Sequence, residues 1–379
     1  MDEDAPLADA FLGALREREK RHDDAESRQR FGQAYQRLID FAGQADHGTQ
    51  DALLHALTAG FSDQQTNWEF GCLANTCGII VELGGDPAIA IEPVLDRITL
   101  LFARIPEIVQ VMRERMGVDN PNAIAHDDWP RLGRAYPDHA WVIGDWHAIQ
   151  FMGCAAMAML VRDVESRKRA RDRIDLAQSA EVAASDNPYA YYISEVLSMI
   201  DDELLVVLDL PRRLGFRVRL TAVRNNFHLF TLLQDALLAH PTATDWRGPC
   251  VRPVVVAVAK SERMLHEIES EPEALAKESG DAIWTYYSWH ALKPDDTLRT
   301  IQETPGQVPY WIWGEGKPTD IPLLDGERVM LLGPLEIPRS WSIGFFAPLH
   351  PALRSSTVVE AVMSDGEYRA WLERIRARR

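Results

Sequence analysis

Imidazole and carboxylate side chains are concentrated in one stretch, residues 126–147. This stretch contains His126, Asp127, His139 and His147. Zinc, iron and manganese bind to these ligand types, and a bound divalent ion would activate water for hydrolysis. The spacing follows no established ligand rule, and a polar loop carries aspartates for turns and helix caps in any case. Two hypotheses follow: a metal-dependent hydrolase site with a divalent ion as cofactor, or a structural loop with no cofactor.

The end of this stretch leads into a long apolar run, Ala148 to Val161. We predict a core helix from about Asp145 to Arg162. In this helix Asp145 serves as the N-cap or lies in the first turn, where the helix dipole stabilises a carboxylate. A histidine at the start of a core helix is more often hydrogen-bonded than functional. We therefore expect His147 to face the apolar core.

The four cysteines form no recognisable thiol site. Cys72 and Cys77 are five positions apart, so on a helix their side chains point about 140° apart and cannot share one ion. Cys154 follows His147 by two helical turns, roughly 10 Å along the axis, which is too far for a catalytic dyad. We expect the cysteines to be reduced packing residues. A thiol enzyme based on Cys154 would need a partner from elsewhere in the chain.

Large aromatic residues are frequent in the C-terminal half, where polar groups accompany them. In the segment "PYWIWGEG" (309–316), strand alternation would place Trp311 and Trp313 on one face and Tyr310 and Ile312 on the other. A strand that is apolar on both faces is either fully buried or presents an adhesive surface. Such residues form a ligand pocket, a protein interface or simply a small core. The candidate binding residues are Trp289, His290, Trp311, Trp313 and Glu315.

Composition narrows the possible partners of the chain. Its 379 residues are 46% apolar and 26% charged, which is typical of a globular protein with room for two domains. The formal net charge of −17 disfavours binding to nucleic acid, because an acidic surface repels phosphate backbones. No apolar run reaches membrane-spanning length, and the acidic N-terminus lacks the basic region of a signal peptide. We therefore expect a cytoplasmic protein that does not engage a membrane.

Periodicity predicts two domains of different class. Residues 1–202 repeat apolar side chains at helical spacing, which predicts an all-α domain, either an irregular bundle or a loose solenoid. Residues 203–379 predict an α+β domain with short aromatic strands and a mixed or antiparallel sheet. The chain as a whole is expected to be mainly α.

Local signals predict particular elements within the two domains. Helix ends are expected at caps and breakers, including Asp63, the Gly84-Gly85 pair, Asp86 with Pro87, Asn187, and Ser364 with Glu367. In the second half, the expected order is a hairpin of 203–210 and 215–223, a helix over 225–240, a strand over 252–259, a helix over 261–279, and strand segments over 283–292, 309–316, 327–333 and 341–348.

The sequence therefore leaves two functional hypotheses. No phosphate-binding loop, dinucleotide fingerprint or serine-hydrolase elbow is present in it. Because no catalytic constellation is complete, we favour a non-enzymatic interaction or scaffold protein that recognises another protein through an aromatic surface in its C-terminal half. The alternative is the metal-dependent hydrolase built on residues 126–147.

Overall fold

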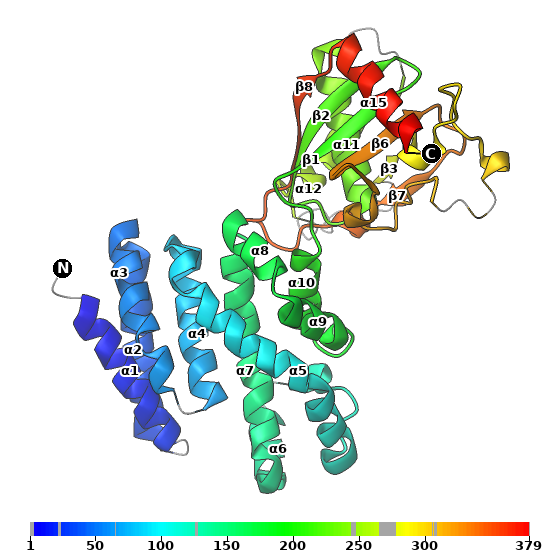
Figure 1. Ribbon diagram of the computed structural model, residues 1–379. Coiled ribbons are helices and arrows are strands. Elements are labelled where there is room, and N and C mark those ends of the chain that lie inside the picture. The colour runs from blue at the N-terminus through cyan, green and yellow to red at the C-terminus, as the bar shows by residue number, and fades with distance from the viewer. Residues whose placement is uncertain are drawn as a thin grey trace. The chain divides into compact units, whose positions relative to one another are not determined.

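The computed structural model describes residues 4–21, 24–64, 66–125, 128–243, 248–264, 278–304, 306 and 309–378. Two compact units divide the chain, Met1–Leu197 and Ser198–Arg379 (Figure 1). As predicted, the chain is mainly helical, and its C-terminal part combines helices with a mixed sheet. Within the described residues, no helix combines the length and the apolar character needed to cross a membrane.

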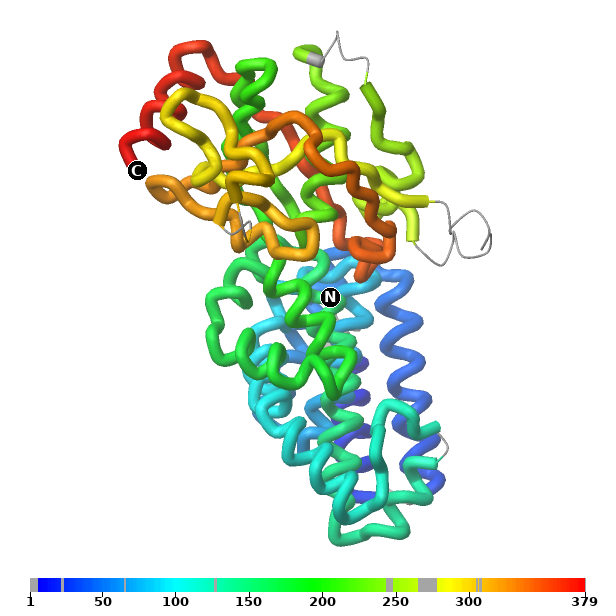
Figure 2. The backbone as a smooth tube through the Cα atoms, turned by 90° about the vertical axis from the view of Figure 1, so that its right-hand side faces the viewer, coloured from blue at the N-terminus to red at the C-terminus, as the bar shows by residue number. Residues whose placement is uncertain are grey.

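Helices make up the regular structure of the described part of the first unit. Neighbouring helices lie side by side, and the most extensive contact joins α4 to α7 (Figure 2). The helices are α1 (Asp4–Lys20), α2 (Ala25–Gln44), α3 (His47–Thr58), α4 (Asn67–Leu83), α5 (Ile91–Met116), α6 (Trp129–Ala135), α7 (Ala140–Leu160), α8 (Val164–Arg171), α9 (Ile174–Ala183) and α10 (Pro188–Leu197), with short 3-10 turns η1 (Phe61–Asp63), η2 (Pro87–Ile89), η3 (Pro121–Ala123) and η5 (Pro137–His139).

Of the two caps predicted for α4, the one at its C-terminal end is confirmed and the one at its start is not. Gly84 ends the helix in a left-handed conformation (φ +131°), as the glycine pair predicts. The predicted cap at its start is wrong, because Asp63 belongs to the preceding turn η1. Thr66 caps the helix instead: it accepts from the N–H of Glu69, whose carboxylate accepts from the N–H of Thr66.

The predicted start of the core helix is also corrected. Helix α7 begins at Ala140, so Asp145 lies inside it and does not cap it. The Asp145 carboxylate is buried, accepts from Asn67 Nδ2 of α4 at 2.7 Å and pairs with Arg104 of α5 at 2.6 Å. It therefore connects three helices rather than stabilising one helix end.

A seam of small residues allows the close approach of α4 and α7. A Cβ atom on Gly78 would lie 2.7 Å from Cα of Ala155, and one on Gly71 would lie 3.0 Å from Cα of Ala148. Both pairs are seven residues apart on their helices, which returns them to the same face after two turns. The backbones therefore touch along two turns. A methyl group would clash at Gly78 and would be tight at Gly71.

The second unit is a twisted sheet between helices. Strand β1 pairs with β2 as the predicted antiparallel hairpin and with β6 in parallel, which makes the sheet mixed. The order is β4-β6-β1-β2-β8, with β5 added to β6, and β3 pairs separately with β7. The strands are β1 (Glu203–Asp209), β2 (Leu214–Thr221), β3 (Ser279–Asp281), β4 (Thr285–Ser288), β5 (Leu323–Leu324), β6 (Glu327–Gly333), β7 (Ser340–Ser342) and β8 (Ser356–Val362).

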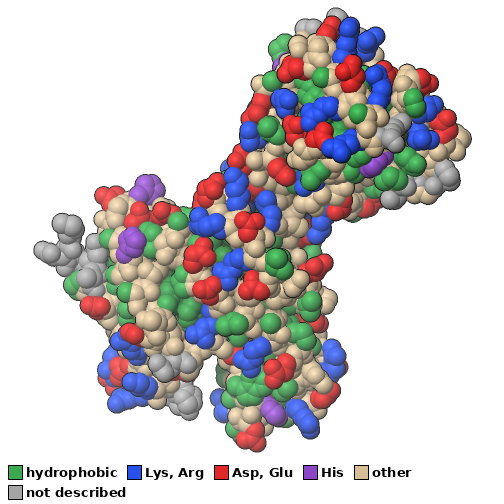
Figure 3. All heavy atoms as spheres, viewed as in Figure 1, with side chains coloured by type: hydrophobic (Ala, Val, Ile, Leu, Met, Phe, Trp, Pro, Cys, Tyr) green, Lys and Arg blue, Asp and Glu red, His purple; other side chains and the backbone are tan. Residues whose placement is uncertain are grey.

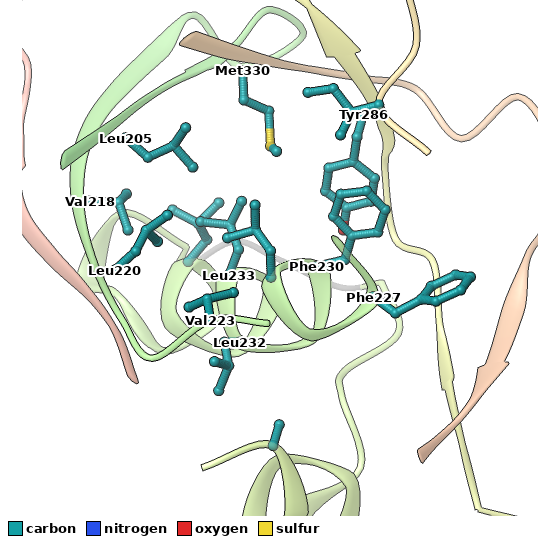
Figure 4. Close-up of a cluster of buried hydrophobic side chains, with 14 of the residues drawn as sticks. Leu205, Val218, Leu220, Val223, Phe227, Phe230, Leu232, Leu233, Tyr286 and Met330 are labelled. Atoms are coloured by element: carbon teal, nitrogen blue, oxygen red, sulfur yellow. The ribbon is translucent and has the colours of Figure 1, made fainter. Parts of the chain in front are cut away.

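The two faces of this sheet carry different helices (Figure 1). On one face, Leu205 and Met330 of the strands pack with α11 (Asn226–Ala239) and α12 (Pro253–Ala259). Figure 4 shows these two side chains pointing toward Leu233 of α11. On the other face, Val206 and Leu331 pack with α15 (Asp365–Ala377). The alternation of neighbouring residues between two covered faces explains why the middle of each strand, 204–208 in β1 and 329–332 in β6, is apolar.

Among the elements predicted for this unit, one is wrong and one lies mostly outside the described residues. The strand predicted over 252–259 is wrong: these residues form helix α12, which opens at Pro253. Its valines pack against α11 and η10 (Ile343–Phe346), and this packing overrides their strand propensity. Most of the helix predicted over 261–279 lies outside the described residues. The expected caps at Asn187 and Ser364 are confirmed.

Candidate binding pocket in the second unit

An apolar cavity of about 220 Å³ lies beside strand β4 of the second unit. Aromatic rings form most of its wall, and few polar atoms face it. Its volume is below the roughly 300–1,000 Å³ of pockets that hold drug-sized ligands, and is closer to the size of one large side chain. The lining residues are Phe230, Ala282, Trp284, Thr285, Tyr286, Trp311, Ile312, Trp313, Ile337, Arg339 and Trp341.

The segment 309–316 reaches the cavity by pairing with β4. The N–H of Ser288 donates to the carbonyl oxygen of Tyr310 at 2.8 Å, and the N–H of Ile312 donates to that of Tyr286 at 3.0 Å. The segment is thus an extra edge of the sheet, joined by a single bridge at Trp311 rather than forming the full strand predicted.

The back wall of the cavity is a pair of stacked rings. Phe230 of α11 and Tyr286 of β4 lie face to face with ring centroids 3.7 Å apart (Figure 4). The Tyr286 hydroxyl donates to Gln234 Oε1 at 2.6 Å, and the same oxygen accepts from the N–H of Ile283. Burial raises the pKa of Tyr286 well above its ordinary value, so the hydroxyl stays protonated. The polar groups behind the wall are therefore satisfied, and the wall itself is apolar.

Trp341, another ring of the cavity wall, lies on the two-stranded sheet of β3 and β7. Trp341 of β7 donates from Nε1 to Thr231 Oγ1 at 3.0 Å and stacks on Phe227. Gly280 of β3 faces this indole so closely that a Cβ atom would lie 2.3 Å from Nε1. Trp341 is thus held on three sides, which fixes its ring in the wall of the cavity.

The mouth of the cavity carries a charged pair and an exposed aliphatic side chain. Arg339 pairs with Glu315, and its guanidinium lies 5.2 Å from the ring centroid of Trp313. Ile337 is 44% exposed although it lines the cavity. Figure 3 shows that charged side chains of both signs are interspersed on the visible face of the molecule. A polar rim around an apolar interior is the usual anatomy of a recognition site.

A second cavity, also of about 220 Å³, shares the wall formed by residues 311–313. Asn226, at the start of α11, lines this cavity and donates from Nδ2 to the carbonyl oxygen of Trp313 at 2.6 Å. Because a carbonyl only accepts, this bond identifies the nitrogen and the oxygen of the amide. The remaining oxygen, Oδ1, is buried and has no hydrogen-bond partner in the described part of the chain.

The predicted binding residues divide between two places. Trp311 and Trp313 line the cavity, and Glu315 pairs with Arg339 at its mouth. Trp289 and His290 line neither cavity: their rings stack on each other 3.7 Å apart, and Trp289 packs on the face of the sheet that carries α15. Sequence reasoning missed Phe230, Asn226, Ile337, Arg339 and Trp341, which come from distant segments with no motif to connect them.

The predicted metal site stays a prediction. His126 and Asp127 lie outside the described residues. His139 directly precedes α7, and His147 on that helix is half-buried with its ring edge-on to Trp129, 4.9 Å between centroids. Within the described ranges, no three His, Cys, Asp or Glu side chains gather as a metal ion would require.

The cysteines are not all packing residues. Cys77 is buried, and burial raises the pKa of its thiol to about 12, which keeps it protonated and unreactive. Cys154 is exposed, contrary to the packing prediction, because it lies on the outer face of α7. Its sulfur lies 3.1 Å from the Tyr189 hydroxyl.

Comparison with known proteins adds no identity to this geometry. The chain matches no model of a protein family, no curated protein and no solved structure.

Proposed function

We propose that the chain is a protein-recognition module, and that the aromatic cavity of its second unit accepts one bulky apolar side chain of a partner protein. The observation that carries the proposal is the cavity of about 220 Å³, which is lined mainly by apolar side chains and has the Arg339–Glu315 pair at its mouth. Burying one such side chain is worth roughly 1.5–3 kcal/mol, enough to anchor an interface.

The rings around the cavity support a binding role over simple core filling. Trp311 and Trp313 are half-buried and Ile337 is 44% exposed, so one side of the aromatic cluster is open to solvent. An aromatic set that only filled the core would be covered on every side. Aromatic residues that remain partly exposed are typical of interaction hot spots.

A screen of random peptides tests this proposal without knowledge of the partner. A library of 12-residue peptides displayed on phage is selected on the full-length chain. The expected result is enrichment of peptides that share one bulky apolar residue, and replacement of that residue by alanine abolishes binding. Failure to enrich any peptide, or enrichment with no shared apolar residue, would contradict the proposal.

A further inference from the structure

The edge of the sheet at Trp311 has main-chain groups without partners. The two hydrogen bonds that join 310–312 to β4 flank Trp311, so Trp311 and Tyr287 form a non-hydrogen-bonded pair. In such an antiparallel pair, the N–H and C=O groups of both residues point away from each other. Those of Tyr287 point to β6, with which it is paired, and those of Trp311 point away from the sheet.

Three main-chain groups at this edge have no hydrogen bond to any described residue: the N–H and C=O of Trp311 and the N–H of Trp313. The groups on either side are already engaged. The carbonyl of Trp313 accepts from Asn226 Nδ2, and the carbonyl of Pro309 accepts from the Ser288 hydroxyl. The unpaired set therefore forms a short, defined row rather than a fully open edge.

This row lies between two cavities. Trp311, Ile312 and Trp313 line both the aromatic cavity and the second cavity, and Asn226 also lines the second cavity. The Asn226 side chain is only 2% exposed.

We infer that the partner binds as an extended polypeptide strand alongside residues 311–313, which deepens and rests on the proposed function. One residue of that strand bonds to the N–H and C=O of Trp311, and the bond to the N–H of Trp313 comes from a carbonyl close along the same strand. Its bulky apolar side chain enters the aromatic cavity. A neighbouring side chain, which points to the other side of the strand, enters the second cavity.

The unpaired main-chain groups at Trp311 and Trp313 favour a partner segment that is extended rather than helical. A helix satisfies its backbone groups internally, so its middle turns offer nothing to the row at Trp311 and Trp313. An extended segment carries unpaired N–H and C=O groups along its length and presents side chains that alternate between its two sides. The row and the two cavities together therefore match an extended segment.

The test replaces single amides by esters in a peptide selected on the full-length chain. An ester removes one N–H and keeps the side chains. We expect one ester, at the residue whose N–H bonds to the Trp311 carbonyl, to weaken binding roughly tenfold or more. An ester at the next residue removes an N–H that faces away from the protein and only weakens the carbonyl that accepts from the Trp311 N–H, so its effect should be smaller. Equal affinity for every ester variant would overturn strand pairing.

A second readout comes from the protein. Labelling with ¹⁵N-tryptophan gives backbone amide signals for the 11 tryptophans, and Trp→Phe variants assign them. The peptide should slow hydrogen exchange at the amides of Trp311 and Trp313 and leave that of Trp146, inside helix α7, unchanged. Unaltered exchange at Trp311 in the bound state would also overturn the inference.

Peptides that need the aromatic cavity but show none of these effects leave the proposed function intact and refute strand pairing alone.

Discussion

At the scale of single residues, buried polar groups determine both stability and its response to pH. His228 of α11 is the clearest case. Its Nε2 donates to the carbonyl of Ala259 at 2.7 Å, and its Nδ1 accepts from the N–H of Arg224 at 3.3 Å. Both ring nitrogens are thus used by the neutral imidazole, and burial lowers the pKa of His228 to about 4.

His228 should make the second unit less stable at mildly acidic pH. In the unfolded chain its pKa returns to about 6.5, so between pH 6.5 and 4 the unfolded state binds more protons. The free energy of unfolding therefore falls as pH decreases through this window, by about 2 kcal/mol from pH 7 to 5 for this residue. Urea unfolding of wild-type and His228→Asn proteins at both pH values measures the effect.

The quantity to compare is the change in the free energy of unfolding between pH 7 and pH 5, because His228→Asn also changes stability at neutral pH. His55→Asn, a substitution of an exposed histidine, should keep the wild-type difference. A His228→Asn protein with an undiminished difference would show that this imidazole does not titrate on unfolding.

Asp145 supports a second prediction at this scale. Asp145→Ala removes the acceptor of both Arg104 and Asn67, and we expect the free energy of unfolding to fall by roughly 2 kcal/mol or more. Asp138→Ala, at an exposed residue just before α7, should have an effect within about 0.5 kcal/mol. Equal effects of the two substitutions in urea unfolding would contradict a structural role for Asp145.

At the scale of elements, the contact between α4 and α7 predicts that two Gly→Ala substitutions change stability in opposite directions. Gly78→Ala places a methyl group against the backbone of Ala155, so we expect about 1–3 kcal/mol of destabilisation. Gly32→Ala, in α2, meets no atom within 4 Å and should stabilise the helix by about 1 kcal/mol. Thermal unfolding midpoints of the two variants should move in opposite directions, and a shift of both in one direction would contradict the seam.

Elements were predictable where their signals are local. Caps such as Asn187, and the hairpin of β1 and β2, depend on neighbouring residues and are confirmed. The region 252–259 was not predictable in this way, because its valines fit a strand by propensity and form α12 through contacts with distant segments. The same holds for Asp145, whose partners lie on α4 and α5.

At the scale of the whole molecule, the predicted fold class is confirmed, whereas the candidate site was predictable only in part. Trp311 and Trp313 stand out in sequence because three large aromatic residues fall within the four positions 310–313. Phe230 and Trp341 do not, because they reach the cavity from α11 and β7. A cavity assembled from segments about 110 residues apart has no local signature.

The central claim is that the aromatic cavity holds an apolar side chain of a bound polypeptide. The most direct measurement is the dissociation constant of one selected peptide for three proteins: the wild type, Ile337→Trp, which blocks the cavity mouth, and Leu323→Trp, which adds the same ring at an exposed residue outside both cavities. We predict binding at least tenfold weaker for Ile337→Trp and unchanged for Leu323→Trp. Equal affinity for all three proteins would contradict the claim.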